Sequence, residues 1–436
     1  MAPPISATWC PGEKKSRIAS SSEPLRLRPL HRVPGPWRPP LSGPIFGAYN
    51  CPLHSGKQRQ NQNAKRPPGT KGGEVYKQWP ESPILASRMT QLDAYDYELP
   101  KDRIAQTPLA VRSDARLLLA DRNSGKIEHW HVRDLPELLA AQDTLVLNDT
   151  RVLPARLVGR RSLTGGRWEG LFLAADRLGL WKVLGRTRGK IQPGEQIVLV
   201  DPEGRDRLTL ELIEKGAEGE WLVRIDSEDD PYAVLERVGR TPLPHYIRGG
   251  EMLPEDRQRY QTVFAQHPGS IAAPTAGLHL DEQLFSKLAE KNVSAAYLTL
   301  HVGRDTFRPI TAESLDAHPM HTEWAHLDAE TADRLNSCRA AGGRIVAVGT
   351  TSVRLLETAA VDGSLAAYEG STDLFIRPPH RFEAVDALIT NFHLPRTTLL
   401  VLVRTFGGDE LIQRAYREAI EQQYRFYSYG DAMLIL

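Results

Sequence analysis

Polar side chains that could do chemistry gather in four short strings of this sequence. Each string combines hydroxyl, imidazole, amide or guanidinium groups with glycine or proline, next to an apolar run. The four strings are APTAGLHL (273–280), LTLHVGRDTFRP (298–309), AVGTTSVR (347–354) and ITNFHLP (389–395). Where a helix begins after a strand, its first backbone N–H groups are unpaired and can bind a polar or anionic ligand. We therefore predict a concave polar site at the ends of strands.

Each string also has a purely structural interpretation. Thr351 or Ser352 could only cap the helix that follows them. Gly349 could only turn the chain, and His393, before Leu-Pro, could be a packed loop residue. The recurrence of the same side-chain chemistry at four strand ends favours function over these interpretations.

The elements that would position the strings alternate between strand and helix. Apolar runs such as RIVAVG (344–349) and DALITNF (386–392) alternate with helical patterns such as DEQLFSKLAEK (281–291) and DELIQRAYREAIEQQY (409–424). This rhythm predicts an α/β domain with a largely parallel sheet. The ligand site of such a sheet lies at the carboxyl ends of its strands. A further buried strand, DTLVLND (143–149), would deliver Asp149, Thr150 and Arg151 to the same edge.

Residues 157–241 have a different pattern. Six short alternating runs are separated by turn sequences such as TGG, QPGE and DPEGRD. Such a series predicts a small β-barrel or sandwich inserted into the larger domain. We therefore divide the chain into an α/β catalytic domain, 89–156 with 242–436, and an inserted β-barrel domain, 157–241.

Residues 1–88 differ from the rest in composition. They contain 15 of the 32 prolines, with 14 Lys/Arg against 4 Asp/Glu, so their net charge is +10 and that of the remainder is −9. They show no sustained apolar periodicity, which is typical of a disordered segment. The segment also weakly resembles a transit peptide, being poor in acidic residues. We favour the interpretation that translation begins at Met89.

Several function classes are excluded by absent motifs. Only Cys338 lies outside residues 1–88, so neither a disulfide framework nor a cysteine-rich metal site can form there. No apolar stretch reaches the roughly 20 residues that span a bilayer. The chain has no G-x-G-x-x-G after a strand, no P-loop and no G-x-S-x-G. His318 and His321 in AHPMH are too few for a zinc site, so we predict no metal site.

Six segments together carry a specific resemblance. The chain resembles the S-adenosylmethionine:tRNA ribosyltransferase-isomerases of queuosine biosynthesis from about Met89 to its C-terminus. The segments are NDTRVLPARL, RYQTVFAQHPGSIAAPTAGLHL, TLHVGRDTFRP, GRIVAVGTTSVRLLE, LITNFHLPRTTLL and YRFYSYGDAMLI.

The resemblance implies an unusual use of S-adenosylmethionine, which donates ribosyl carbons instead of a methyl group. The ribosyl group is transferred and isomerised onto 7-aminomethyl-7-deazaguanine at the tRNA wobble position. Epoxyqueuosine-tRNA forms, and adenine and methionine are released. The implied fold is an α/β domain with an inserted small β-barrel. The alternative is a non-catalytic RNA-binding protein on the same scaffold.

The implied chemistry assigns roles to residues in the matching segments. A base must remove a proton beside the sulfonium, and His279 and His301 are the candidates, because imidazole titrates near neutral pH. Asp149 could face cationic groups, and Arg151 or Arg354 could hold the methionine carboxylate. The choice between the two histidines stays open. The expected nucleoside pocket is lined by Thr275, Gly277, Thr350, Thr351, Ser352, Asn391 and His393.

The remaining expectations concern partners. Arg160, Arg161, Arg186 and Arg188 in the first half of the barrel could touch a tRNA backbone, or could form only a solvated charged rim. The partners expected are S-adenosylmethionine as co-substrate and a tRNA carrying the deazaguanine precursor, with no bound cofactor and no membrane. We expect a cytoplasmic monomer.

Overall fold

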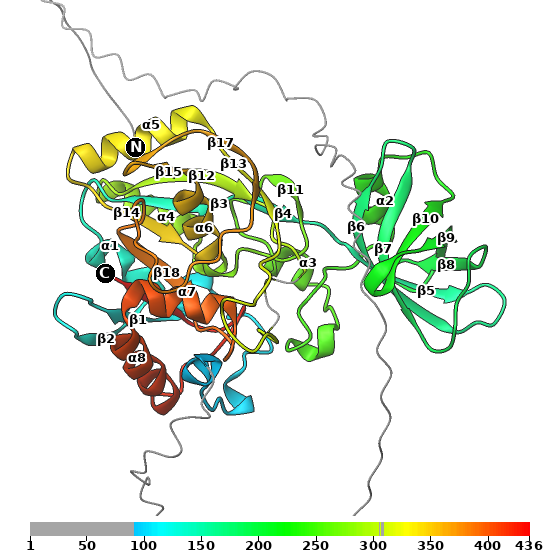
Figure 1. Cartoon of the computed structure of the whole chain (residues 1–436), viewed down its shortest axis with the longest axis horizontal. Coiled ribbons are helices and arrows are strands. Elements are labelled where there is room, and N and C mark those ends of the chain that lie inside the picture. The colour runs from blue at the N-terminus through cyan, green and yellow to red at the C-terminus, as the bar shows by residue number, and fades with distance from the viewer. Residues whose placement is uncertain (1–90, 305, 307–308) are drawn as a thin grey trace, which may run out of the picture. The chain divides into compact units, whose positions relative to one another are not determined.

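The computed structural model describes residues 91–304, 306 and 309–436 (Figure 1). The predicted extension 1–88 and the predicted start at Met89 lie outside the described residues. Within the described part, no helix has both the length and the apolar character that crossing a membrane requires.

A nine-stranded sheet forms the centre of the larger domain. Its strand order is β17-β13-β12-β3-β14-β18-β19-β1-β2. In chain order these strands are β1 Arg116–Ala120, β2 Ile127–His131, β3 Thr144–Asn148, β12 Ser294–Leu300, β13 Glu323–Leu327, β14 Ile345–Val348, β17 Tyr368–Thr372, β18 Ala387–Asn391 and β19 Ala432–Ile435.

The sheet is mixed, so the prediction of a largely parallel sheet was wrong. The pairs β12–β3, β3–β14, β14–β18 and β1–β19 are parallel. The pairs β17–β13, β13–β12, β18–β19 and β1–β2 are antiparallel. The apolar pattern could not reveal this, because a short buried run such as AMLI in β19 fits either direction.

Helices cover both faces of the sheet. In β3, Val146 packs into one apolar cluster, while Leu145 and Leu147 pack into the other, as the two-residue period of a strand requires. Helices α5 to α8 contribute to the first cluster and α1 and α4 to the second. The helices are α1 Leu135–Leu138, α2 Pro231–Val238, α3 Asp256–Arg259, α4 Glu282–Glu290, α5 Ala329–Ala340, α6 Thr350–Ala359, α7 Thr398–Gly407 and α8 Asp409–Glu421.

The predicted six-stranded barrel is confirmed. Six antiparallel strands close in the order β10-β7-β6-β5-β8-β9. Their interior is apolar, with Trp168, Val183 and Ile197 fully or almost fully buried. The strands are β5 Arg156–Arg161, β6 Arg167–Ala175, β7 Leu180–Thr187, β8 Gln196–Val200, β9 Asp206–Lys215 and β10 Glu220–Ile225. The domain boundaries at 156/157 and 241/242 stay a prediction.

A two-stranded ladder lies beside the end of β3. After β3 the chain bends at Asp149 and continues as β4, Thr150–Val152, which pairs in parallel with β11, His267–Ser270. This ladder brings residues 267–270 to the segment that the sequence placed at the sheet edge. The short strands β15, Ala360–Val361, and β16, Ser364–Leu365, form a separate hairpin.

Candidate active site

The carboxyl ends of β14 and β18 lie side by side, because these strands are parallel neighbours. The 3-10 turn Thr275–His279 packs against β18. Between these segments lies a narrow cavity of about 20 Å³. Its lining includes five of the predicted substrate-binding residues: Thr275, Thr350, Thr351, Asn391 and His393.

Helix α6 begins directly at this cavity. Gly349 is its N-cap residue, with a φ of +91° that favours glycine, and no side chain caps the helix. The alternative that Thr351 or Ser352 caps α6 therefore does not hold. The Thr351 hydroxyl instead accepts from the Asn148 amide at 3.2 Å. The buried Ser352 hydroxyl donates to the Val348 carbonyl at 2.9 Å, so it serves the helix and not the cavity.

Asn391 organises the polar wall of the cavity. Its Oδ1 accepts from the Thr275 hydroxyl at 2.8 Å, and its Nδ2 lies 2.9 Å from Nε2 of His279. The same Nδ2 donates to the Tyr427 carbonyl at 3.3 Å. Because a carbonyl can only accept, this contact fixes which amide atom faces His279. His279 therefore accepts through Nε2 and carries its proton on Nδ1.

His279 is buried and neutral. Burial, with smaller contributions from Arg425 and Arg112, lowers its pKa to about 4. Since the Nε2 lone pair is already used by Asn391, His279 cannot take a proton through that atom without breaking the contact. The geometry makes His279 a positioning residue for Asn391 and, through it, for Thr275.

His393 is packed within its loop, as a purely structural residue would be, and it also lines the narrow cavity. Its Nε2 lies 2.7 Å from the Thr390 hydroxyl, and its backbone N–H donates to the Tyr416 hydroxyl at 2.9 Å. Burial lowers the pKa of His393 to about 3. It is therefore a neutral hydrogen-bonding group at neutral pH.

His301 lies on the ladder side of the sheet edge and is only partly buried. Its Nδ1 is 2.8 Å from the Thr150 hydroxyl, which also contacts the Ser270 hydroxyl at 3.0 Å. The ring stacks on Trp324 with centroids 5.1 Å apart. A Cβ at Gly269 would lie 2.5 Å from His301 Nε2, so only glycine permits this approach. Burial, followed by the charge of His267, lowers the pKa of His301 to about 4.

Asp149 precedes Thr150 and is also held by hydrogen bonds. Its Oδ1 accepts from the Thr299 hydroxyl at 2.7 Å, and its Oδ2 lies 3.6 Å from His267 Nε2. Burial raises the pKa of this carboxyl, and the Thr299 hydrogen bond opposes that rise. Asp149 is therefore the residue before Thr150, the hydroxyl of which contacts His301.

The structure places the two predicted carboxylate-binding arginines elsewhere. Arg354 is buried and forms an ion pair with the buried Glu323, and it also donates to the Leu374 and Thr372 carbonyls. A guanidinium that is neutralised in this way has no support as the partner of a methionine carboxylate. Arg151 is exposed and lies 3.6 Å from Glu236, outside the narrow cavity.

Gly277 lines no part of the narrow cavity but is needed for packing. A Cβ there would lie 2.8 Å from the Phe264 ring and 2.9 Å from the Thr262 methyl group. Its predicted contact with a nucleoside is therefore not visible in the arrangement of the described residues.

The four barrel arginines divide into two pairs. Arg160 forms an ion pair with Asp206, and Arg161 binds Glu195 through two nitrogens. Arg186 and Arg188 are exposed and have no ion pair with any described residue. Only the second pair keeps an uncompensated charge that could meet an RNA phosphate.

Some residues of the site were missed by the sequence analysis. Asn148 bridges β12 and α6 by donating to the Leu300 carbonyl and to Thr351. Glu323 accepts from the Gly303 N–H and the Thr306 hydroxyl besides pairing with Arg354. An asparagine in the apolar run TLVLN could have been noticed, since a buried amide needs partners. Glu323 lies in a short strand that carried no signal.

Among the described residues, no group of three or more His, Cys, Asp or Glu side chains is arranged to hold a metal ion. The polar groups at the sheet edge bind one another through hydrogen bonds, such as Thr275 with Asn391, and through the Arg354–Glu323 ion pair. Such a site can position hydroxyl and amide groups of a ligand and can offer a neutral imidazole to a proton.

Comparisons with known proteins identify the family of this chain. A family model described as queuosine biosynthesis protein matches residues 92–435. This range contains the sheet, the barrel and all the strand-end segments. This match and the names of the relatives below make the chain a tRNA-modifying transferase of queuosine biosynthesis.

Individual relatives define the family further. S-adenosylmethionine:tRNA ribosyltransferase-isomerases from Symbiobacterium thermophilum and Staphylococcus saprophyticus are 49% and 44% identical to this chain. Each alignment covers 79% of this chain, and 100% and 99% of the relative. The chain therefore belongs to the family of S-adenosylmethionine:tRNA ribosyltransferase-isomerases. A crystal structure of the S-adenosylmethionine tRNA ribosyltransferase from Thermotoga maritima is 36% identical, with coverage of 79% and 100% and a TM-score of 0.45.

Proposed function

We propose that this chain transfers and isomerises the ribosyl moiety of S-adenosylmethionine onto 7-aminomethyl-7-deazaguanine at the wobble position of a tRNA. The products are epoxyqueuosine-tRNA, adenine and methionine. The observation that carries the proposal is the meeting of Thr275, Thr351 and Asn391 from three separate segments at one sheet edge. Family membership gives the reaction class, and these groups supply donors and acceptors for a nucleoside.

The nucleoside needs more room than the narrow cavity offers. A second cavity of about 600 Å³ has Ile271, Ala272, Gly303 and Arg304 in its lining. Ala272 and Gly303 are the sequence neighbours of Ala273 and Val302, which line the narrow cavity. The volume of the second cavity suits a ligand of nucleoside size. We place S-adenosylmethionine in this wider cavity, with the hydroxyl and amide groups of the narrow one forming its polar end. Arg186 also lines the wider cavity, where the tRNA base would enter.

His301 is the proposed proton acceptor. It is partly exposed, neutral at pH 7, and two residues from Gly303 in the wider cavity. Loss of the proton beside the sulfonium needs an unprotonated base within hydrogen-bond reach. The carboxylate of Asp149, at the end of the neighbouring strand β3, would face the positive charge of the sulfonium. His279 acts only through Asn391.

The proposal also covers the cofactor requirement, the location and the oligomeric state of the protein. The reaction needs no metal ion and no redox cofactor, since S-adenosylmethionine supplies both the transferred group and the leaving groups. The protein acts as a cytoplasmic monomer on tRNA that carries the precursor base.

The test incubates the full chain with S-adenosylmethionine and tRNA bearing the precursor base. Adenine and methionine should be released in step with modification of the base, and neither should appear with unmodified tRNA. Methyl transfer to the RNA, or release that does not depend on RNA, would contradict the proposal.

Two histidine variants test the roles of the side chains. His301→Gln should lower kcat by about 10²- to 10⁴-fold, the usual contribution of a general base, with little change in tRNA affinity. His279→Gln is the matched control. It should lower the thermal midpoint, because it alters a buried hydrogen bond, and it should lower kcat less than His301→Gln does. The opposite ranking would assign proton transfer to His279.

A further inference from the structure

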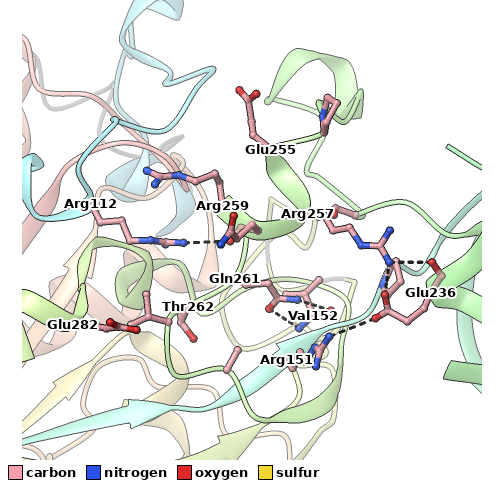
Figure 2. Close-up of a pocket in the computed structure, with 16 residues that line it drawn as sticks. Arg112, Arg151, Val152, Glu236, Glu255, Arg257, Arg259, Gln261, Thr262 and Glu282 are labelled. Atoms are coloured by element: carbon pink, nitrogen blue, oxygen red, sulfur yellow. Dashed lines mark hydrogen bonds and ion pairs between the residues drawn. The ribbon is translucent and has the colours of Figure 1, made fainter. Parts of the chain in front are cut away.

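Four arginines line a large cavity outside the candidate active site (Figure 2). Its volume is about 750 Å³, and it shares no lining residue with the narrow cavity. Thr262, in its wall, packs its methyl group near Gly277 of the turn. The turn therefore separates this cavity from the candidate active site. The arginines are Arg112, Arg151, Arg257 and Arg259.

The four guanidinium groups are not equivalent. Arg257 forms an ion pair with Glu236, and Arg151 lies 3.6 Å from the same carboxylate (Figure 2). Within the described ranges, Arg112 donates only to the Leu278 and Gln258 carbonyls, at 2.9 and 3.2 Å. Within the same ranges, Arg259 donates only to the carbonyls of residues 109 and 110. Backbone carbonyls orient these two side chains without cancelling their charge.

Arg112 and Arg259 are also close enough to repel each other. Burial, followed by the charge of Arg259, lowers the pKa of Arg112. Glu255 and Glu282 line the same cavity, but neither forms an ion pair with these arginines. The charge of Asp281 also acts on Arg112 and opposes this shift, but neither arginine has an ion-paired carboxylate among the described residues. Two partly buried like charges in this arrangement are stabilised when an anion binds between them.

A third group points to the same kind of ligand. Thr262 is only 5% exposed, and its hydroxyl has no hydrogen-bond partner within the described ranges. A buried unpaired hydroxyl costs free energy, and a bound acceptor recovers it once a rotation of the side chain turns this oxygen from the closed wall into the cavity. By contrast, Gln261 uses both ends of its amide on the backbone of Val152, at 3.0 and 2.7 Å, so it holds the wall.

We propose that Arg112, Arg259 and Thr262 bind a backbone phosphate of the RNA substrate. Guanidinium groups match the oxygens of a phosphate in pairs, and a neutral hydroxyl can donate to a third oxygen. The inference rests on the proposed function, because it takes the RNA as the source of the phosphate. It also gives the RNA a contact outside the barrel, where Arg160 and Arg161 are neutralised by Asp206 and Glu195.

The contact would be linked to the active site through one hydrogen bond. Arg112 donates to the carbonyl of Leu278, and the next residue, His279, orients Asn391. A phosphate that holds Arg112 therefore also holds the turn whose other side lines the narrow cavity. RNA bound at this cavity supports the geometry in which the nucleoside is bound.

The test compares Arg259→Gln with the matched control Arg257→Gln in the full chain. Both variants remove one cation from the same cavity, but the charge of Arg257 is already neutralised. Arg259→Gln should weaken tRNA binding on the order of tenfold, as expected for loss of a charged hydrogen bond. It should also reduce the slope of log affinity against log salt by about 0.7 to 0.9. Arg257→Gln should stay within about twofold of the wild type, given the low energy of exposed ion pairs.

Further measurements separate charge from folding. Arg259→Lys keeps the charge and should restore most of the tRNA affinity. Thermal midpoints are measured for both variants, because a variant that loses affinity only by misfolding has a lower midpoint than the wild type. Inorganic phosphate alone should bind far more weakly than tRNA, and equal affinity would mean a free phosphate is the ligand. Wild-type affinity and salt slope in Arg259→Gln, with RNA-dependent adenine release intact, would overturn the inference and leave the proposed function standing. Absence of that release in the wild type would instead overturn the proposed function.

Discussion

The sheet edge and the barrel treat polar side chains in opposite ways. At the sheet edge, Asn391, His279 and Glu323 are buried and hydrogen-bond to one another or to neighbours. In the barrel, the interior is apolar, and charged pairs such as Arg160 with Asp206 lie outside, each about half exposed. Water can replace a lost partner in such exposed pairs, but it cannot do so for the buried groups of the sheet edge.

The two regions therefore differ in their sensitivity to substitution. A buried polar group that loses its partner keeps its desolvation penalty, whereas an exposed ion pair contributes little to stability. The barrel can therefore tolerate surface changes, and its role depends on shape and charge. The sheet edge depends on every member of its network, which is what a site that must hold a reacting nucleoside requires.

A fall in pH should produce the largest difference in stability between the two regions. Histidines 279, 301 and 393 have pKa values of about 4, 4 and 3 in the folded chain, against 6.5 when unfolded. Below pH 6.5 the unfolded chain binds protons that the folded chain does not. The free energy of unfolding should therefore fall between pH 6.5 and 4, by more than about 5 kcal/mol for the three together.

The barrel provides the internal control for this titration. No histidine lies between residues 157 and 241, and the barrel carries Trp168, Trp181 and Trp221 as fluorescent reporters. Urea unfolding at pH 7.5 and pH 5 should show loss of the sheet domain before the barrel signal changes. Equal stability of the sheet domain at both values would mean that these histidines are not held neutral.

Glu323→Ala should have the next largest effect. It leaves the Arg354 guanidinium buried without its carboxylate, a change that typically destabilises by about 3 to 5 kcal/mol. It also removes the acceptor of the Gly303 N–H and the Thr306 hydroxyl. Urea unfolding measures the loss, and Asp206→Ala in the barrel is the matched control. A loss below about 1 kcal/mol would show that water reaches Arg354.

Arg160→Ala should have the smallest effect. Its ion pair with Asp206 is half exposed, so the stability of the barrel should change by less than about 1 kcal/mol. Because the charge of Arg160 is already neutralised, tRNA affinity should also change little, and Arg186→Ala should reduce it more. Filter binding of tRNA to the two variants makes the comparison. A larger loss for Arg160→Ala would restore the original prediction that the whole rim touches RNA.

Local patterns were enough to predict much of the fold. The six barrel strands follow runs of alternating residues, and the helices after Asp281 and Gly408 follow helical periodicity. The direction of strands was not predictable, because β13 and β19 are short runs that fit either direction. The pairing of Arg354 with Glu323 joins residues 31 positions apart and leaves no local trace.

The sequence by itself determined the family, the barrel strands and the strand ends at which polar groups accumulate, because these depend on residue type and on spacing within a few positions. Only the tertiary structure decided what each polar group faces. In APTAGLHL, Thr275 donates to Asn391, and the Nε2 lone pair of His279 accepts from the same amide. His301, in another segment, is the more accessible imidazole. Such choices depend on contacts between residues more than 100 positions apart, and on burial, which sets whether a histidine carries charge.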